Sequence, residues 1–311
     1  MTSIKIAPNY LSMIMPARWY AGGKGLDEFR NHMLTDKHIS VFHDFLNPEQ
    51  LFPNTNIRGG LCYFLWDANH NNTQNLTRVV THSANRIISD TKRTLKTEGT
   101  EVFIRNTQAI SIIEKVFKKN PERLEKYVST RKPFGLDTTF AKGDNFRDSS
   151  TKINNAVECY GKGWQIGFVK REEIKQHSEW IDIWKLYTSR ANNIGTELND
   201  DNLVTVIGKP NTVCTESYLI IGVGLNLTEE SSKNLSTYCR TKFARFMHSL
   251  AKSSQDATAK TYRFVPLQDF TSKSDIDWTK SVAEIDRQLY AKYNLTDEEI
   301  AFIEQMIKPM E

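Results

Sequence analysis

A glycine-rich turn holds the residues with the clearest potential for chemistry. Gly22-Gly23-Lys24-Gly25 follows a short apolar segment, and glycines beside a lysine are typical of turns that cradle a phosphate. A nucleotide-binding P-loop needs a serine or threonine directly after the lysine, whereas Lys24 is followed by Gly25 and Leu26. The second glycine-lysine pair, Gly208-Lys209, is followed by Pro210. The sequence therefore gives no support for nucleotide hydrolysis.

Histidines, cysteines and acidic residues form no pattern typical of a catalytic or metal site. The seven histidines include no His-Glu-x-x-His motif, and no Gly-x-Ser-x-Gly elbow occurs. The four cysteines lie far apart, which favours reduced, buried thiols over a zinc site or a disulfide framework. A nuclease-like set of Asp137, Glu173 and Lys175 arises easily by chance in a chain of 311 residues. We therefore expect neither a catalytic residue nor a metal site in this chain.

Cations and aromatic residues lie side by side at several places in the second half of the chain. Cations suit DNA phosphates and aromatic rings suit base faces. For any single cluster, aromatic rings facing a core and cations facing water explain the pattern equally well, and we interpret Trp164 as a packing residue. A net charge of +4 permits binding to a polyanion without requiring it. The clusters span residues 131–134, 162–164, 240–246 and 260–264.

Length and composition predict a folded, soluble protein of about two domains. The chain has 311 residues, of which 39% are apolar, so it can bury a sizeable core. No apolar run approaches the roughly 18 residues that a membrane span needs, and residues 1–8 lack the pattern of a signal peptide. We therefore expect a cytoplasmic location and no membrane partner.

The first 70 residues have the pattern of an α/β sheet. Residues 10–16, 39–45 and 61–66 are short apolar runs that predict strands, the first of them buried. Residues 26–34 have helical spacing with acids in the first turn, which predicts a crossover helix. Three strands are too few for an independent doubly wound domain, so this segment is interpreted as part of a larger sheet.

The remaining 241 residues are more polar and mixed in pattern. Residues 71–125 predict a helical connector that ends near Asn120-Pro121. Short strands are predicted at residues 164–169, 203–207 and 217–222. A long helix is predicted over 231–251, another around Ile285 to Tyr290, and a last one that starts at the capping residue Thr296.

Long strings of the sequence resemble the adenine-specific DNA methyltransferases of type II restriction-modification systems. The front of the chain carries MIMPARWYAGGKGLDEFR at residues 13–30, then Phe52-Pro53, then GGLCYFLWD at residues 59–67. Later strings resemble the target-recognition region of that family. They span residues 129–136, 206–210, 214–218, 238–246, 264–270 and 277–309.

The resemblance implies a fold and a division of the chain. The fold expected is α/β, with a partial Rossmann-like methyltransferase sheet followed by a mixed α+β target-recognition domain. Residues 1–75 would be the C-terminal part of the catalytic domain and 76–126 a helical connector. Residues 127–272 would be the target-recognition domain, followed by C-terminal helices at 273–311.

The resemblance also marks what this sequence does not contain. In the family, an early glycine-rich turn binds S-adenosylmethionine and an Asn-Pro-Pro-Tyr motif holds the flipped adenine. The 311 residues contain no Pro-Pro pair. By the family's order, both motifs would precede Met1. We therefore expect no cofactor in this chain alone, and S-adenosylmethionine only if a separate N-terminal half completes it.

The resemblance assigns roles in DNA binding to particular residues. Methylation of a base in a duplex requires flipping it out, and the pocket stacks on it. The family carries an aromatic residue for stacking on a later strand, which here implies Phe64 or Trp66. Cations and hydroxyls would contact phosphates and base edges. The DNA-binding candidates are Arg18, Lys24, Arg131, Lys132, Lys162, Lys170, Arg171, Arg190, Lys209, Thr215, Lys242 and Arg245.

Three functions remain open on the sequence alone. The first is a recognition half that binds double-stranded DNA and is catalytically silent by itself. The second is an active adenine methyltransferase that forms with a separately encoded N-terminal half or works beside a restriction subunit. The third is a remnant whose exposed sheet edge binds another protein.

Overall fold

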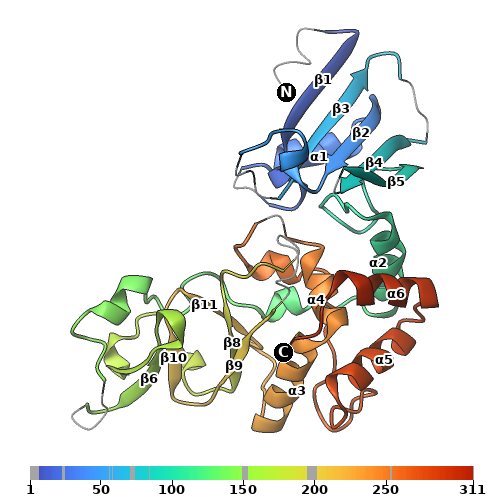
Figure 1. Cartoon of the computed structure of the whole chain (residues 1–311). Coiled ribbons are helices and arrows are strands. Elements are labelled where there is room, and N and C mark those ends of the chain that lie inside the picture. Colours follow the sequence, from blue (N-terminus) through green and yellow to red (C-terminus); the bar gives the residue numbers. More distant parts are fainter. Residues whose placement is uncertain are drawn as a thin grey trace. The chain divides into compact units, whose positions relative to one another are not determined.

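The computed structural model describes residues 7–22, 25–55, 57, 59–70, 74–83, 85–148, 153–194, 202–252 and 254–310. Two compact units emerge from the contacts within the chain (Figure 1). Unit 1 comprises residues 1–118 and 250–254, and unit 2 comprises residues 119–249 and 255–311. Each unit is described by itself.

Unit 1 is built on a five-stranded mixed sheet. The strands are β1 (Tyr10–Pro16), β2 (Ile39–Phe45), β3 (Leu61–Asp67), β4 (Thr77–Ser83) and β5 (Arg86–Arg93). Their order is β1-β3-β2-β4-β5. β3 is antiparallel to both of its neighbours and β2 is parallel to β4, so β1, β2 and β4 all run the same way. Helix α1 (Asp27–Thr35) connects β1 to the parallel strand β2, which confirms the predicted crossover helix.

One face of this sheet packs against α1 and a short 3-10 helix that follows β1. Trp19 is buried at the centre of the cluster, edge-on to Tyr20, Phe29 and Phe42 with ring centroids 4.8 to 6.1 Å apart. Edge-to-face contacts of this kind add to the stabilisation from burial. Met33 of α1 is fully buried in the same cluster. The apolar stripe of α1 therefore fixes the helix across β2 and β3.

Two sequence predictions for unit 1 were wrong. β1 is an edge strand rather than a buried one, with Tyr10 63% and Ile14 46% exposed. β4 and β5 occupy part of the segment predicted as a helical connector. The reason is that Val79 and Val80 are the only apolar residues of β4, and the other buried positions, Thr77 and Thr81, are polar, so the strand has no apolar run or alternation in the sequence.

The rest of the predicted connector is helical. Helix α2 spans Thr107–Lys119, which ends beside Asn120-Pro121 as predicted, and it buries Ile112, Ile113 and Val116. The sheet thus continues past residue 75, through β4 and β5. The division of the chain into functional segments at residues 75, 126 and 272 stays a prediction.

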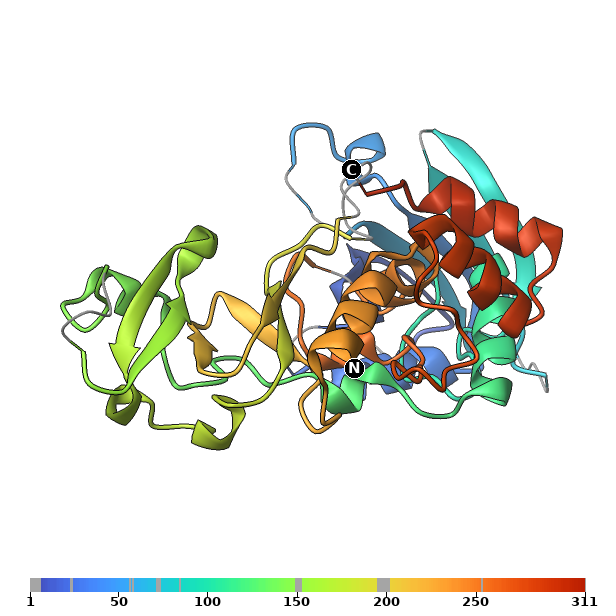
Figure 2. The same cartoon turned by 90° about the horizontal axis from the view of Figure 1, so that it is seen from below.

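Unit 2 contains two three-stranded sheets and four helices among its described residues. The first sheet has the order β10-β6-β7 and the second β11-β8-β9. The first lies at the end of unit 2 away from α5 and α6 in both views (Figures 1 and 2). The strands are β6 (Ala156–Tyr160), β7 (Ile166–Lys170), β8 (Lys185–Ser189), β9 (Thr205–Gly208), β10 (Thr212–Cys214) and β11 (Tyr218–Ile221). The helices are α3 (Glu229–Arg240), α4 (Lys242–Ser249), α5 (Val282–Lys292) and α6 (Asp297–Met306).

The strands predicted at residues 164–169, 203–207 and 217–222 correspond to β7, β9 and β11, whereas β6, β8 and β10 were not predicted. The last helix begins at Thr296, which accepts from the backbone N–H of Glu299, as predicted. The single helix predicted over 231–251 is instead two helices that meet at the extended residue Thr241. Asp286 of α5 accepts from the backbone N–H groups of Lys242 and Phe243, both at 2.9 Å, and so caps α4.

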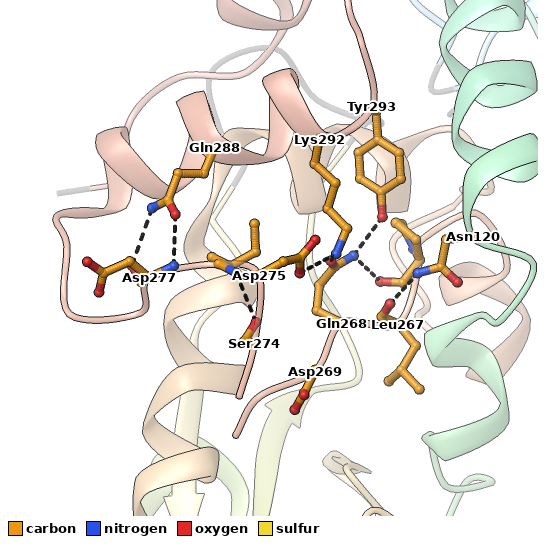
Figure 3. A network of polar contacts seen from close by, with 12 residues as sticks. Asn120, Leu267, Gln268, Asp269, Ser274, Asp275, Asp277, Gln288, Lys292 and Tyr293 are labelled. Atoms are coloured by element: carbon orange, nitrogen blue, oxygen red, sulfur yellow. Dashed lines mark hydrogen bonds and ion pairs between the residues drawn. The ribbon is translucent and has the colours of Figure 1, made fainter. Parts of the chain in front are cut away.

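A polar network ties α5 to the loop that precedes it (Figure 3). The Gln268 side chain is buried, donates to the Tyr293 hydroxyl at 2.8 Å and accepts from Lys292 Nζ at 2.8 Å. Lys292 also binds Asp275 at 2.7 Å. Asn120 donates to the Leu267 carbonyl, which joins the segment after α2 to the same loop. The polar side-chain groups of Gln268, Lys292 and Tyr293 all have hydrogen-bond partners here, so we interpret the network as structural.

The described structure confirms a mixed α/β protein with several sheets. None of its helices is long and apolar enough to cross a membrane. Within the described residues, no three histidine, cysteine or acidic side chains gather as metal ligands would. All four cysteines are buried free thiols.

Replacing Gly60 by alanine is expected to destabilise the protein by about 2 kcal/mol or more. Gly60 has a φ of +91°, and an added Cβ would lie 2.4 Å from the Phe45 carbonyl oxygen. Gly25→Ala is the matched control, because Gly25 has a φ of +77° but no atom within 4 Å of the added Cβ. Urea unfolding followed by circular dichroism measures both variants. Equal unfolding midpoints would contradict the steric explanation.

Candidate nucleic-acid interface

The carboxyl ends of β1, β2 and β4 lie at one edge of the sheet in unit 1, where open α/β sheets usually bind ligands. Arg30 holds the turn that follows β1. Its buried guanidinium donates to the Trp19 and Gly22 carbonyls at 3.2 Å each and to the Glu101 carbonyl at 2.8 Å. Arg18 is exposed on this turn. Lys24 lies outside the described residues.

A buried ion pair closes the same edge. Asp44 at the end of β2 is fully buried and binds Arg105 through two contacts of 2.7 and 2.9 Å. The Tyr20 hydroxyl donates to Asp44 at 2.9 Å, and burial, reinforced by this carboxylate, raises the pKa of Tyr20. Arg105 also donates to the Gly59 carbonyl at 2.8 Å. Because both of its oxygens accept from these three donors, Asp44 acts as a structural anchor.

The structure does not bring Phe64 and Trp66 to the surface. Phe64 is 1% and Trp66 7% exposed, both on the face that α1 covers, and the indole N–H of Trp66 donates to Asp36 at 3.0 Å. Both side chains are core residues here, because alternate residues of β3 share the inner face.

Phe52 is an exposed aromatic residue at this edge that the sequence did not single out for stacking. It lies in the loop between β2 and β3, is 40% exposed and follows Leu51, which is 37% exposed. In the sequence, Phe52-Pro53 contributed only to the family resemblance, and Phe52 was not predicted to stack on a base. One signal could have identified Phe52: it is an aromatic residue in a loop, and it has no apolar partners at the spacing of a strand or a helix.

In unit 2, several candidate cations gather at the two ends of the β6–β7 hairpin. Ala156 pairs with Lys170 at one end of the hairpin, and Tyr160 pairs with Ile166 at the other. The second end carries the exposed residue Lys162, in the turn that joins the strands. The five-residue strands separate these ends by about 13 Å.

The Lys162 end also holds Arg131 and Trp164. Arg131 forms an ion pair with Glu216 at 2.9 Å while 63% of its side chain stays exposed. Trp164 stacks on Tyr218, two residues after Glu216, with ring centroids 4.1 Å apart. Lys132 lies 3.8 Å from Asp137. This end of the hairpin therefore combines exposed cations with a partly buried aromatic pair.

The opposite end of the hairpin holds Lys170, Arg171 and Lys209. Arg171 binds Asp182 through contacts of 2.6 and 2.8 Å, and it also reaches Asn211. Lys170 and Lys209 are exposed. Arg190 lies elsewhere in unit 2 and pairs with Asp256 at 2.9 Å. The acid partners lower the net positive charge at both of these places.

Three candidate DNA-binding residues do not lie free at the surface. Thr215 is fully buried and Arg245 is 1% exposed. The side chain of Lys242 is 15% exposed and forms an ion pair with Glu304. The basic-aromatic cluster at 240–246 is thus mainly interior helix, since α4 buries six of its eight residues. Sequence could not show this, because cations on a helix usually face solvent.

A histidine pair lies on the sheet face of unit 1 opposite α1. His43 Nδ1 and His82 Nε2 are 2.8 Å apart, and His43 stacks on Tyr63 while His82 stacks on Phe45. A hydrogen bond at this distance needs one nitrogen to donate and the other to accept. Burial first and the neighbouring His82 second lower the pKa of His43 to about 4. Burial also lowers the pKa of His82.

Comparison with known proteins confirms the family resemblance at the front of the chain. Residues 1–52 match the family model described as Eco57I restriction-modification methylase. The chain is 33% identical over 69 residues to a protein of Mycoplasma pneumoniae named "Uncharacterized adenine-specific methylase". That match covers 22% of this chain and 16% of the Mycoplasma protein. The chain therefore resembles adenine-specific methylases of restriction-modification systems.

Two solved restriction enzymes align weakly over almost the whole chain. The type IIG restriction endonuclease BpuSI aligns with 96% of this chain and 46% of its own, at 13% identity and a TM-score of 0.38. The type IIL restriction-modification enzyme MmeI, solved in complex with DNA, aligns with 97% of this chain and 50% of its own, at 9% identity and a TM-score of 0.42. Such scores do not establish a shared fold. The chain spans half or less of the length of each of these relatives.

Acidification is expected to weaken the fold of unit 1 through the histidine pair. The pKa of His43 is about 4 in the folded protein, whereas its ordinary value is 6.5. As the pH falls, His43 therefore takes up a proton in the unfolded chain before it does so in the folded protein. The free energy of unfolding should therefore decrease from about pH 6.5 toward pH 4. His43→Phe removes this group and keeps a ring against Tyr63, so its decrease should be smaller.

His32→Gln on the exposed surface of α1 is the control and should follow the wild type. Urea unfolding at a series of pH values measures all three proteins. Parallel pH profiles for the wild type and His43→Phe would show that the pair does not govern acid sensitivity.

Proposed function

We propose that this chain carries the DNA-recognition part of an adenine-specific methylase from a restriction-modification system. The match of residues 1–52 to the restriction-modification methylase family carries this proposal. In this proposal, unit 1 is part of a larger Rossmann-like methyltransferase sheet, and unit 2 reads double-stranded DNA. The exposed cations at the ends of the β6–β7 hairpin support the second assignment.

We propose that this chain alone does not transfer a methyl group from S-adenosylmethionine. The buried acid of the carboxyl edge, Asp44, supports the proposal, because both of its oxygens accept from Arg105 or Tyr20. Incubation of the isolated protein with S-adenosylmethionine and duplex DNA should give no methylated adenine. Methylation by the isolated chain would refute the proposal of a silent recognition half.

The exposed edge strand favours a second candidate function. Among the described residues, no strand pairs with the outer edge of β1, and Tyr10 and Ile14 of this strand are exposed, a pattern that invites strand pairing. A separate polypeptide with the front half of a methylase would pair here and complete an active enzyme. Methylation that appears only when both polypeptides are co-expressed would support this function. Protein binding at β1 without any DNA binding would favour a pure interaction role.

Binding of the full chain to duplex DNA should depend steeply on salt. If the exposed residues Lys162, Lys170 and Lys209 each contact one phosphate, the slope of log affinity against log salt is about −2.7. The Kd should then rise about 40-fold between 50 and 200 mM salt. Fluorescence anisotropy with a labelled duplex measures it. Binding that is absent at 50 mM salt, or independent of salt, would contradict a role in DNA recognition.

Phe52 is proposed as the residue of unit 1 that stacks on an unpaired base. An unpaired adenine lowers the cost of unstacking, so the wild type should prefer a duplex with a mismatched adenine over a paired one. Phe52→Ala should lose about 10-fold of this preference, since stacking on one aromatic ring contributes about 1–3 kcal/mol. Leu51→Ala is the matched control, because it removes a neighbouring side chain of similar exposure without a ring. Equal losses in the two variants would exclude stacking by Phe52.

A further inference from the structure

The turn between β6 and β7 has an unusual backbone. Gly163 has a φ of +74° and Trp164 a φ of +63°. Two consecutive residues thus adopt the left-handed region, which a bulky residue such as tryptophan enters only under strain. Strain of this kind persists when the surrounding contacts over-determine the backbone, and it gathers at functional sites.

Tyr218 of β11 supplies those contacts. Its hydroxyl accepts from the Trp164 backbone N–H at 2.6 Å and donates to the Gly161 carbonyl at 2.8 Å. Its ring stacks on the Trp164 indole at an interplanar angle of 24°. The Gly161 N–H donates to the Gln165 carbonyl at 2.7 Å and closes the turn. Since Tyr218 is 2% exposed, the turn is fastened from inside the domain.

This fastening directs the polar side chains of the turn outward. Lys162 and Gln165 are both exposed, and neither side chain forms a hydrogen bond or an ion pair in the part of the chain that the structure describes. A glutamine amide can donate to N7 of adenine and accept from its N6 amino group in the major groove. The turn joins the antiparallel strands β6 and β7, and β6 also pairs with β10.

The opposite end of the hairpin is ordered differently. Lys170 and Lys209 are exposed there, and Arg171 is held by Asp182. At the Lys162 end, the Trp164 ring stacks on Tyr218, while Lys162 and Gln165 stay exposed. The two ends therefore differ in how the turn is held rather than in the sign of their charge.

We infer that the Lys162–Gln165 turn, held by Tyr218, enters the major groove of duplex DNA, where Gln165 reads an adenine and Lys162 contacts a neighbouring phosphate. This inference rests on the proposed DNA-recognition function and names the element that performs it. Tyr218 is a positioning residue that touches no DNA. A rigid turn reads bases more selectively, because its conformational entropy is lost during folding and not when DNA binds.

Selection of duplexes from a randomised library by the full chain tests the role of Gln165. The wild type should enrich a sequence with an adenine at one position, and Gln165→Ala should lose about 10-fold of the preference at that position alone. Gln165→Glu should shift the preference there toward cytosine, whose amino group a carboxylate accepts. Gln176→Ala, at another exposed glutamine of unit 2, is the control and should keep the wild-type sequence.

Lys162 and Tyr218 have different expected signatures in the same assay. Lys162→Ala should weaken binding to all sequences equally and lower the salt slope by about 1. Tyr218→Phe keeps the ring stack but removes both hydroxyl hydrogen bonds, so it should broaden the selected sequence while circular dichroism stays unchanged. A purely structural tyrosine would lower thermal stability without broadening the selected sequence.

The outcomes separate this inference from the proposed function. A wild type that binds no DNA refutes the proposed function. A wild type that selects a defined sequence, together with a Gln165→Ala variant that selects the same sequence with the same affinity, overturns the role of this turn alone.

Discussion

The buried carboxylate of Asp44 is the constraint on which the carboxyl edge of unit 1 depends. A charge with no exposed surface must be paired and hydrogen-bonded, because burying it alone would cost several kcal/mol. The Arg105 guanidinium pairs with this carboxylate and also donates to the Gly59 carbonyl. These contacts join the segment before α2 to the start of β3. The Tyr20 hydroxyl adds the turn after β1. One carboxylate thereby orders the segments that frame the edge.

Unit 2 uses its charges in a different way. Several of its surface cations have an acidic partner in reach, as Arg171 has Asp182 and Arg190 has Asp256. Exposed pairs of this kind add little to stability, so their effect is to shape the surface potential rather than to hold the fold. The fold itself is held by buried helices and strands and by polar networks such as that of Gln268.

The sequence predicted most of the helices and six of the eleven described strands, and it predicted side-chain exposure poorly. Runs such as 39–45 and 61–66 are apolar enough to mark β2 and β3, and Thr296 marks the start of α6. β4 was missed because Arg78 and His82 interrupt its apolar pattern. Phe64 has the residue type of a stacking group, but only the position of α1 shows that it is core. Burial depends on which element covers a residue, and neighbouring residues do not encode that.

The cap that Asp286 places on α4 bears on how the domains of such proteins can be exchanged. α4 lies within the segment that would recognise DNA, whereas Asp286 lies beyond residue 272 on α5. A graft that ended at residue 272 would leave two backbone N–H groups of a buried helix without their acceptor, at a cost of about 1–2 kcal/mol. α4 therefore depends on α5 for its cap, and a graft that carries α4 has to bring α5 with it.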